Sequence, residues 1–236
     1  HPVPLQQYEL EDLRNMLPFL KKVKRIDFKG GEPMMAKHHN QFLKWLIEED
    51  MTDIELFYTT NGTVQNPKIL KLLSNFKRVS ICFSIEGTGD LYSYIRGGKY
   101  TIEDFEKTLA VYDKLENVQI MFNVTLQNYN MFNLPDLHFF LHEMEDKYDR
   151  VSANNSFTTI CNKPAYLSPM NLPDDLRDKA IGRLSLFSDF EKLVESMKQR
   201  TFNPELWETF INFTNDLDKM RGDNVVKAVP QLKEHF

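Results

Sequence analysis

The sequence predicts an α/β protein built on parallel strands, and three observations predict it. In the first two-thirds of the 236 residues, short apolar runs alternate with segments of helical periodicity. The connections between these segments are short, and the expected strands are almost continuously apolar. Crossover helices make successive strands parallel, and strands without polar alternation are covered on both faces. An open α/β sheet and a partial or closed α/β barrel both satisfy this pattern.

The expected elements come in a regular order before residue 162. Strands are expected at 23–31, 53–62, 78–87, 118–127 and 150–160. Helices are expected at 37–50, 66–76, 101–115 and 134–148. Asn66 before Pro67 predicts one helix start, because asparagine caps first-turn N–H groups and proline suits the first helical position. Thr101 with Asp104 predicts a capping box at the start of another helix.

The alternation stops near residue 162, where the proline-bearing stretch NKPAYLSPMNLP begins. Helical patterns then cover 174–200 and 204–222. We therefore expect two domains, a partial α/β barrel over 1–162 and a helical C-terminal extension over 163–236.

Composition is that of an ordinary globular protein, with 42% hydrophobic residues, 27% charged residues and a net charge of -5. The acidic balance disfavours a broad nucleic-acid surface, and no apolar run approaches the roughly 20 residues of a membrane span. Cys82 and Cys161 are far apart in sequence and are expected to be buried thiols, which favours a cytoplasmic location. The adjacent His38 and His39 are expected to face solvent or cap a helix, and no metal site is predicted.

Polar and glycine residues gather where the expected strands end. Because the carboxyl ends of parallel strands meet on one rim, these residues are expected there together. Gly30 and Gly31 would let a ligand approach bare backbone, and Arg96 can hold a carboxylate through two parallel hydrogen bonds. Such groups suit a ligand with both an ammonium and a carboxylate. We call these strand-end segments corners, and they are Gly30-Gly31-Glu32-Pro33, Thr59-Thr60-Asn61-Gly62, Ser84-Ile85-Glu86-Gly87, Asn123 with Thr125, and Asn154-Asn155-Ser156.

The order FKGGEP, YTTNG, then FSIEG and YIRGG resembles the radical S-adenosylmethionine (radical SAM) enzymes. Within that family, the resemblance is strongest to the subgroup whose C-terminal extension is shortened; this extension is called a twitch domain. The resemblance covers about residues 20–160 and, less specifically, the helical tail ending in LDKMRG…VP. It implies a partial (β/α)6 TIM-type barrel, with GGEP holding the methionyl amino group and the later corners holding ribose and carboxylate. The cofactor-binding residues implied are Gly30, Gly31, Glu32, Pro33, Thr60, Asn61, Ser84, Glu86, Arg96 and Asn123.

Two departures from the family pattern stand out. Glu86 occupies a position where the family usually has aspartate, and the CxxxCxxC motif is absent. That motif supplies three thiolates to a [4Fe–4S] cluster and lies upstream of GGEP in the family. We therefore expect a chain that is truncated at its N-terminus, lacks its first strand, binds no cluster and does not itself cleave S-adenosylmethionine. The resemblance implies that the parent protein uses the cluster to cleave S-adenosylmethionine reductively, so that a 5′-deoxyadenosyl radical abstracts a substrate hydrogen.

Two other interpretations remain open, and no catalytic residue is assigned in any of them. One is a cofactor-independent α/β-barrel lyase or aldolase with Glu32 and Glu86 as acid and base. The other is a non-catalytic binding or scaffold barrel. The substrate is expected to be a peptide or small molecule rather than nucleic acid, and no membrane partner is expected. An exposed sheet edge offers a surface for a homodimer.

Overall fold

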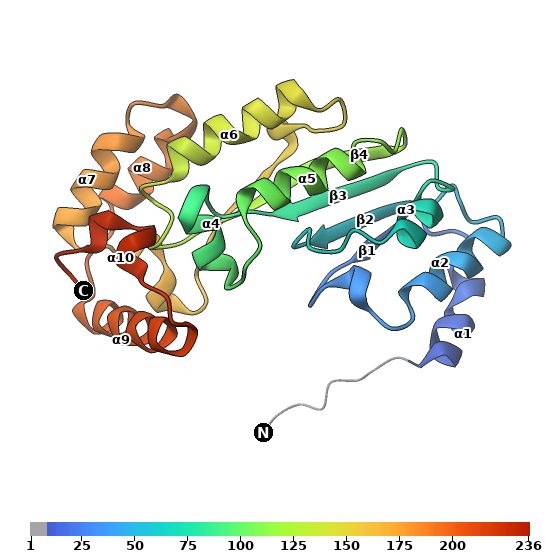
Figure 1. Cartoon of the computed structure of the whole chain (residues 1–236), viewed down its shortest axis with the longest axis horizontal. Helices are drawn as coiled ribbons and strands as arrows, with labels where there is room; N and C mark the ends of the chain where they lie inside the picture. The colour runs from blue at the N-terminus through green and yellow to red at the C-terminus, as the bar shows by residue number, and fades with distance from the viewer. Residues whose placement is uncertain (1–8) are drawn as a thin grey trace. The chain divides into compact units, whose positions relative to one another are not determined.

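The computed structural model describes residues 9–236, so the first eight residues of the expected barrel domain lie outside it. Within the described residues, five parallel strands in the order β1-β2-β3-β4-β5 form an α/β partial barrel (Figure 1). The α/β class is confirmed, and the six-strand count stays a prediction. The strands are β1 (Arg25–Phe28), β2 (Glu55–Thr60), β3 (Val79–Ser84), β4 (Val118–Leu126) and β5 (Phe157–Ile160).

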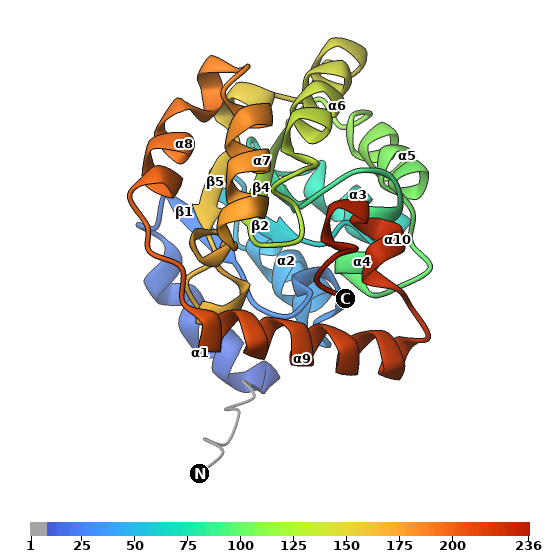
Figure 2. The ribbon, with the colours of Figure 1, turned by 90° about the vertical axis from the view of Figure 1, so that its left-hand side faces the viewer.

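Helices follow the strands in the expected alternation, and two unexpected helices accompany them. The four expected crossovers are α2 (His39–Glu48), α3 (Pro67–Leu73), α5 (Ile102–Tyr112) and α6 (Leu134–Lys147). The two unexpected helices are α1 (Leu10–Leu20) and α4 (Gly89–Arg96). The C-terminal helices are α7 (Asp174–Leu184), α8 (Glu191–Lys198), α9 (Pro204–Arg221) and α10 (Val225–Ala228). Figure 2 shows α9 from end to end. No helix within 9–236 has the length and apolarity needed to cross a membrane.

Both expected helix starts are confirmed by their hydrogen bonds. The Asn66 side chain accepts from the Lys68 N–H at 2.9 Å, with Pro67 in the first turn of α3. At the start of α5, the Asp104 N–H donates to Thr101 Oγ1 and the Thr101 N–H donates to Asp104 Oδ2, each at 3.3 Å. These local signals therefore fix where two crossover helices begin.

Two expected elements are wrong in their extent. The stretch 150–160 is a strand only from Phe157, because Ala153–Asn155 forms a 3-10 turn. Asparagine and serine side chains compete with strand pairing by bonding to nearby backbone, which explains the shorter strand. The stretch 174–200 is two helices rather than one, because α7 ends at Leu184 and a 3-10 turn, Ser188–Phe190, precedes α8.

The chain divides into two compact units, and each is described by itself. Unit one comprises residues up to 84, 107–121 and 148–152; unit two comprises 85–106, 122–147 and 153–236. In unit one, Tyr58, Phe76 and Phe83 are fully buried core residues, and in unit two Phe122 and Phe210 are. Each unit therefore has its own apolar core. The division expected at residue 162 stays a prediction.

Candidate functional site

The first candidate cluster lies in unit one, where β1 ends in two glycines. Gly30 and Gly31 have φ angles of 85° and 49°, a left-handed conformation that glycine adopts without steric cost. A Cβ atom built on either residue would meet no atom within 4 Å, so close packing does not require these glycines. Within the described part of the chain, neither residue takes part in a backbone hydrogen bond. Their N–H and C=O groups are therefore available to a ligand.

The Glu32 carboxylate joins the turn after β1 to the turn after β2. Its Oε1 accepts from the Thr60 hydroxyl at 2.8 Å and from the Met34 N–H at 3.3 Å, and its Oε2 accepts from the Asn61 N–H at 2.9 Å. The Asn61 side chain is itself engaged, because its Oδ1 accepts from the N–H and hydroxyl of Thr63. Glu32, Thr60 and Asn61 thus lie together as predicted, with Glu32 positioning the two turns.

A cavity of about 740 Å³ opens beside this glycine corner in unit one. Its lining includes Gly30, Glu32 and Pro33 together with apolar side chains such as Phe28 and Phe42. Cavities of roughly 300–1,000 Å³, mostly apolar with a few polar groups, are typical of small-molecule sites. The corner therefore borders a space of the size that a small molecule occupies.

His39 lines the same cavity and was missed as a site residue by the sequence prediction. The expectation that both adjacent histidines face solvent or cap the helix is wrong for His39, which is 5% exposed. Its Nε2 lies 2.9 Å from the Tyr58 hydroxyl, and burial lowers the pKa of His39 to about 4. The signal was present in the sequence, because His39 precedes Phe42, Leu43 and Leu46 at helical spacing on the buried face.

The second candidate cluster lies in unit two and consists of Glu86 and Arg96. The Arg96 Nη2 lies 2.6 Å from Glu86 Oε2, and the side chains are 23% and 8% exposed. Beyond this ion pair, Glu86 Oε2 and Arg96 Nε and Nη2 have no hydrogen-bond partner within the described residues. Burial raises the pKa of Glu86, and the nearby guanidinium opposes that shift. Buried polar atoms without partners are uncommon in folded proteins.

Three neighbours hold the Glu86 turn in place. The Ile85 N–H donates to the Asn123 carbonyl at 3.0 Å, which ties the turn to β4. The Asn133 side chain accepts from the Thr88 N–H at 2.7 Å. A Cβ on Gly87 would lie 2.8 Å from a methyl group of Leu91 and 3.0 Å from Asn133 Oδ1, so any larger residue would force these side chains to shift. Asn133 lies at the start of α6, and no sequence pattern singled it out.

Each cluster by itself offers groups that can bind part of an amino acid. Gly30 and Gly31 present backbone donors and acceptors, while Glu86 and Arg96 present opposite charges. Ser84, at the end of β3 in unit one, is partly buried and has no side-chain hydrogen bond within the described chain. Asn154 and Asn155 lie in a 3-10 turn instead of the expected strand. The assignment of the ten expected residues to a cofactor stays a prediction.

The cysteines of this chain do not fit an iron–sulfur cluster, which takes three or four thiolate ligands. The sequence contains two cysteines. Cys82 is buried in β3 beside Phe57 and Met121, and burial raises the pKa of its thiol to about 11. Cys161 is a partly buried free thiol, so the expectation that both thiols are buried is confirmed for Cys82 alone. No cluster-dependent step is therefore assigned to these residues.

No family model and no curated protein matches this sequence. Among solved structures, the crystal structure of Streptococcus suis SuiB bound to precursor peptide SuiA is similar, with a TM-score of 0.54 and 14% identity. That match covers 86% of this chain and 43% of SuiB. The structure of TYW1 with a lysine-pyruvate adduct matches at a TM-score of 0.38 and 17% identity, covering 75% of this chain and 57% of TYW1. The chain thus spans less than two-thirds of either protein, and the likeness to SuiB is one of fold.

Proposed function

We propose that this chain is the S-adenosylmethionine-binding part of a twitch-type radical SAM enzyme that acts on a peptide. The observation that carries the proposal is the ion pair of Glu86 and Arg96, largely removed from solvent, whose charged atoms have no hydrogen-bond partner beyond each other within the described residues. A polar ligand can supply the further hydrogen bonds that these two charged groups lack. The partial barrel has a fold relationship to the radical SAM enzymes, which supports the family assignment.

The proposed roles are given for the residues of each unit by itself. In unit one, the backbone carbonyls of Gly30 and Gly31 are proposed acceptors for an ammonium group, and Glu32 keeps their turn beside the turn of Thr60. In unit two, Arg96 holds a carboxylate and Glu86 accepts from hydroxyl or ammonium groups.

A peptide is the proposed substrate class. SuiB, which shares the fold, is bound to a precursor peptide in its crystal structure. The net charge of -5 also disfavours a polyanionic substrate such as nucleic acid. The likeness to SuiB supports a peptide, and the net charge argues against nucleic acid.

Cofactor binding to the purified chain tests this proposal. Equilibrium dialysis with radiolabelled S-adenosylmethionine should show saturable binding that weakens at least about tenfold in Arg96→Gln, a loss of about 1.4 kcal/mol. Arg183→Gln is the matched control, because Arg183 lies on α7, is 40% exposed and pairs with Asp136. Circular dichroism should show all three proteins folded. Equal affinity of Arg96→Gln and the wild type, or no saturable binding by the wild type, would contradict the proposal.

A second candidate, a cofactor-independent lyase, is favoured by the raised pKa of Glu86, a property that suits a general acid. The other carboxylate named for this candidate, Glu32 in unit one, accepts three hydrogen bonds through its two oxygens. Those hydrogen bonds occupy the second carboxylate, so the structure gives this candidate less support. Saturable cofactor binding that depends on Arg96 would favour the first candidate.

A further inference from the structure

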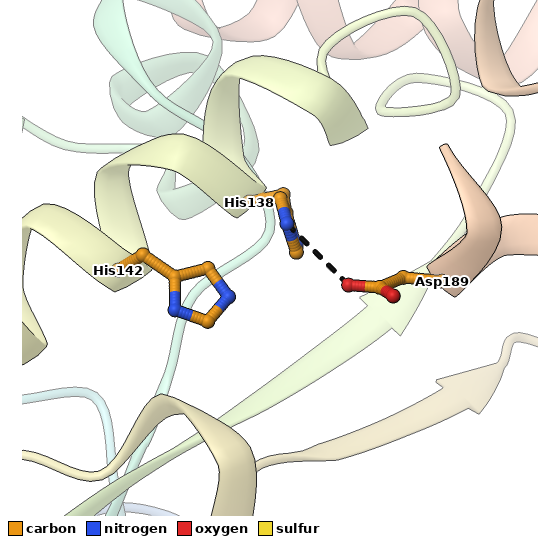
Figure 3. Close-up of side chains that lie close together, drawn as sticks. All are labelled: His138, His142 and Asp189. Atoms are coloured by element: carbon orange, nitrogen blue, oxygen red, sulfur yellow. Dashed lines mark ion pairs between the residues drawn. The ribbon is translucent and has the colours of Figure 1, made fainter. Parts of the chain in front are cut away.

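Three side chains of metal-ligating type converge in unit two, outside both clusters described above. His138 and His142 lie one turn apart on α6, and Asp189 comes from the 3-10 turn Ser188–Phe190. Their ligand atoms all lie within 4.8 Å of one another, and Figure 3 shows the three side chains around a common space. We propose that His138, His142 and Asp189 bind a divalent transition metal ion, with Zn²⁺ the best match.

The distances between ligand atoms suit this metal. His138 Nε2 lies 3.4 Å from Asp189 Oδ2. In a tetrahedral zinc site with bonds of roughly 2.0–2.2 Å, neighbouring ligand atoms are about 3.3 Å apart. This pair therefore already has the spacing of two zinc ligands. His142 and Asp189 are 42% and 60% exposed, so rotation of their side chains can bring the third ligand closer.

A carboxylate orients the second histidine in the manner of known metal sites. His142 Nδ1 lies 3.2 Å from Glu145 Oε2, and the other Glu145 oxygen accepts from the Ala153 N–H at 3.0 Å. When Nδ1 donates its proton to a carboxylate, Nε2 keeps its lone pair for a metal. The Glu145 contact therefore selects the tautomer in which His142 can act as a ligand through Nε2.

The surroundings leave room for a fourth ligand. The three residues line a cavity of about 460 Å³, whose other walls include the apolar Leu137 and Phe190. Three protein ligands with an open fourth position are typical of catalytic rather than structural zinc sites. A donor set of two imidazoles and one carboxylate favours zinc over calcium or magnesium, which take mainly oxygen ligands. We expect water or an anion in the fourth position.

Metal titration of the tag-free, chelator-treated chain tests the site. Co²⁺ should bind in one equivalent with the visible absorption bands of a tetrahedral site, and Zn²⁺ should displace it. His142→Asn should abolish this spectrum, and Glu145→Gln should weaken Zn²⁺ binding about 10- to 100-fold by removing the orienting carboxylate.

His235→Asn is the matched control for these variants. His235 Nε2 lies 3.1 Å from Asp175 Oδ2, so it forms a histidine–aspartate pair outside the proposed site. Its substitution should leave the Co²⁺ spectrum and the Zn²⁺ affinity unchanged. Circular dichroism of each apo variant should match the wild type, which separates loss of ligand from loss of fold. Absence of saturable metal binding by the wild type, or wild-type binding by His142→Asn, would overturn the proposal.

Discussion

Replacement of His39 by glutamine should remove a large part of the acid sensitivity of the fold. His39 is buried against Tyr58, and burial lowers its pKa to about 4 from an ordinary value of 6.5. The unfolded chain therefore binds a proton at this histidine more readily than the folded chain between these two values. The stabilisation due to neutral His39 is present above about pH 6.5 and is lost as the pH falls toward 4.

The size of the effect follows from the two pKa values. With a pKa of about 4 in the folded state and 6.5 in the unfolded state, lowering the pH from 7 to 5 lowers the free energy of unfolding by about 2 kcal/mol. A raised Glu86 pKa acts in the opposite direction, because that carboxyl stabilises the fold more at low pH. The comparison of wild type with His39→Gln isolates the histidine contribution, since both proteins contain Glu86.

Urea unfolding at pH 7 and pH 5 measures this difference directly. The wild type should lose about 2 kcal/mol more between the two pH values than His39→Gln does. His38→Gln is the matched control, because it changes the adjacent histidine and leaves the contact between His39 and Tyr58 intact. An equal pH dependence of the wild type and His39→Gln would refute the linkage between burial of His39 and acid sensitivity.

Three further substitutions test the local structure by urea unfolding. Glu32→Ala should lower the free energy of unfolding by about 2–4 kcal/mol, because the Glu32 carboxylate accepts three hydrogen bonds. The control Glu116→Ala, at an exposed position, should change it by no more than about 0.5 kcal/mol. A similarly small loss in Glu32→Ala would contradict the role of Glu32 in joining the two turns. Asn66→Ala should cost about 1 kcal/mol by removing the cap of α3, and no change would argue against that cap. Gly97→Ala should destabilise by at least about 1 kcal/mol, because φ is 67° and a Cβ would lie 2.8 Å from a neighbouring guanidinium. Gly182→Ala, in helix α7 with open space around it, should be neutral or stabilising, and similar losses in both glycine variants would count against this reasoning.

The strands and crossover helices were predictable because each carries its own apolar pattern. All five strands and all four expected crossover helices are present, and the caps at Asn66 and Thr101 mark two of the starts. Helix α1 was missed although Leu10, Leu13, Leu17 and Leu20 recur at helical spacing; it contains Pro18, a residue type that usually interrupts a helix. Helix α4 was missed because it has eight residues, too few for a clear helical period.

Contacts between distant residues were less predictable than the corners themselves. The GGEP, TTNG and SIEG corners could be placed at strand ends, but the hydrogen bonds from Thr60 and Asn61 to Glu32 depend on strand pairing. The contact between Glu86 and Arg96 depends on α4, which carries Arg96 back to the Glu86 turn. The proposed metal site depends on the break between α7 and α8, because that break places Asp189 beside His138.

The length of the Glu86 side chain determines how Arg96 can meet a ligand. Aspartate at this position would be shorter by one methylene, about 1.5 Å, and would not reach the guanidinium that Glu86 contacts at 2.6 Å. In this chain, a ligand carboxylate must therefore compete with Glu86 for Arg96. When Glu86 is displaced, it needs a proton or a cationic partner, because an isolated buried carboxylate is costly. Under the proposed function, the ligand groups that satisfy both side chains at once are a carboxylate at Arg96 and a hydroxyl or ammonium donor at Glu86.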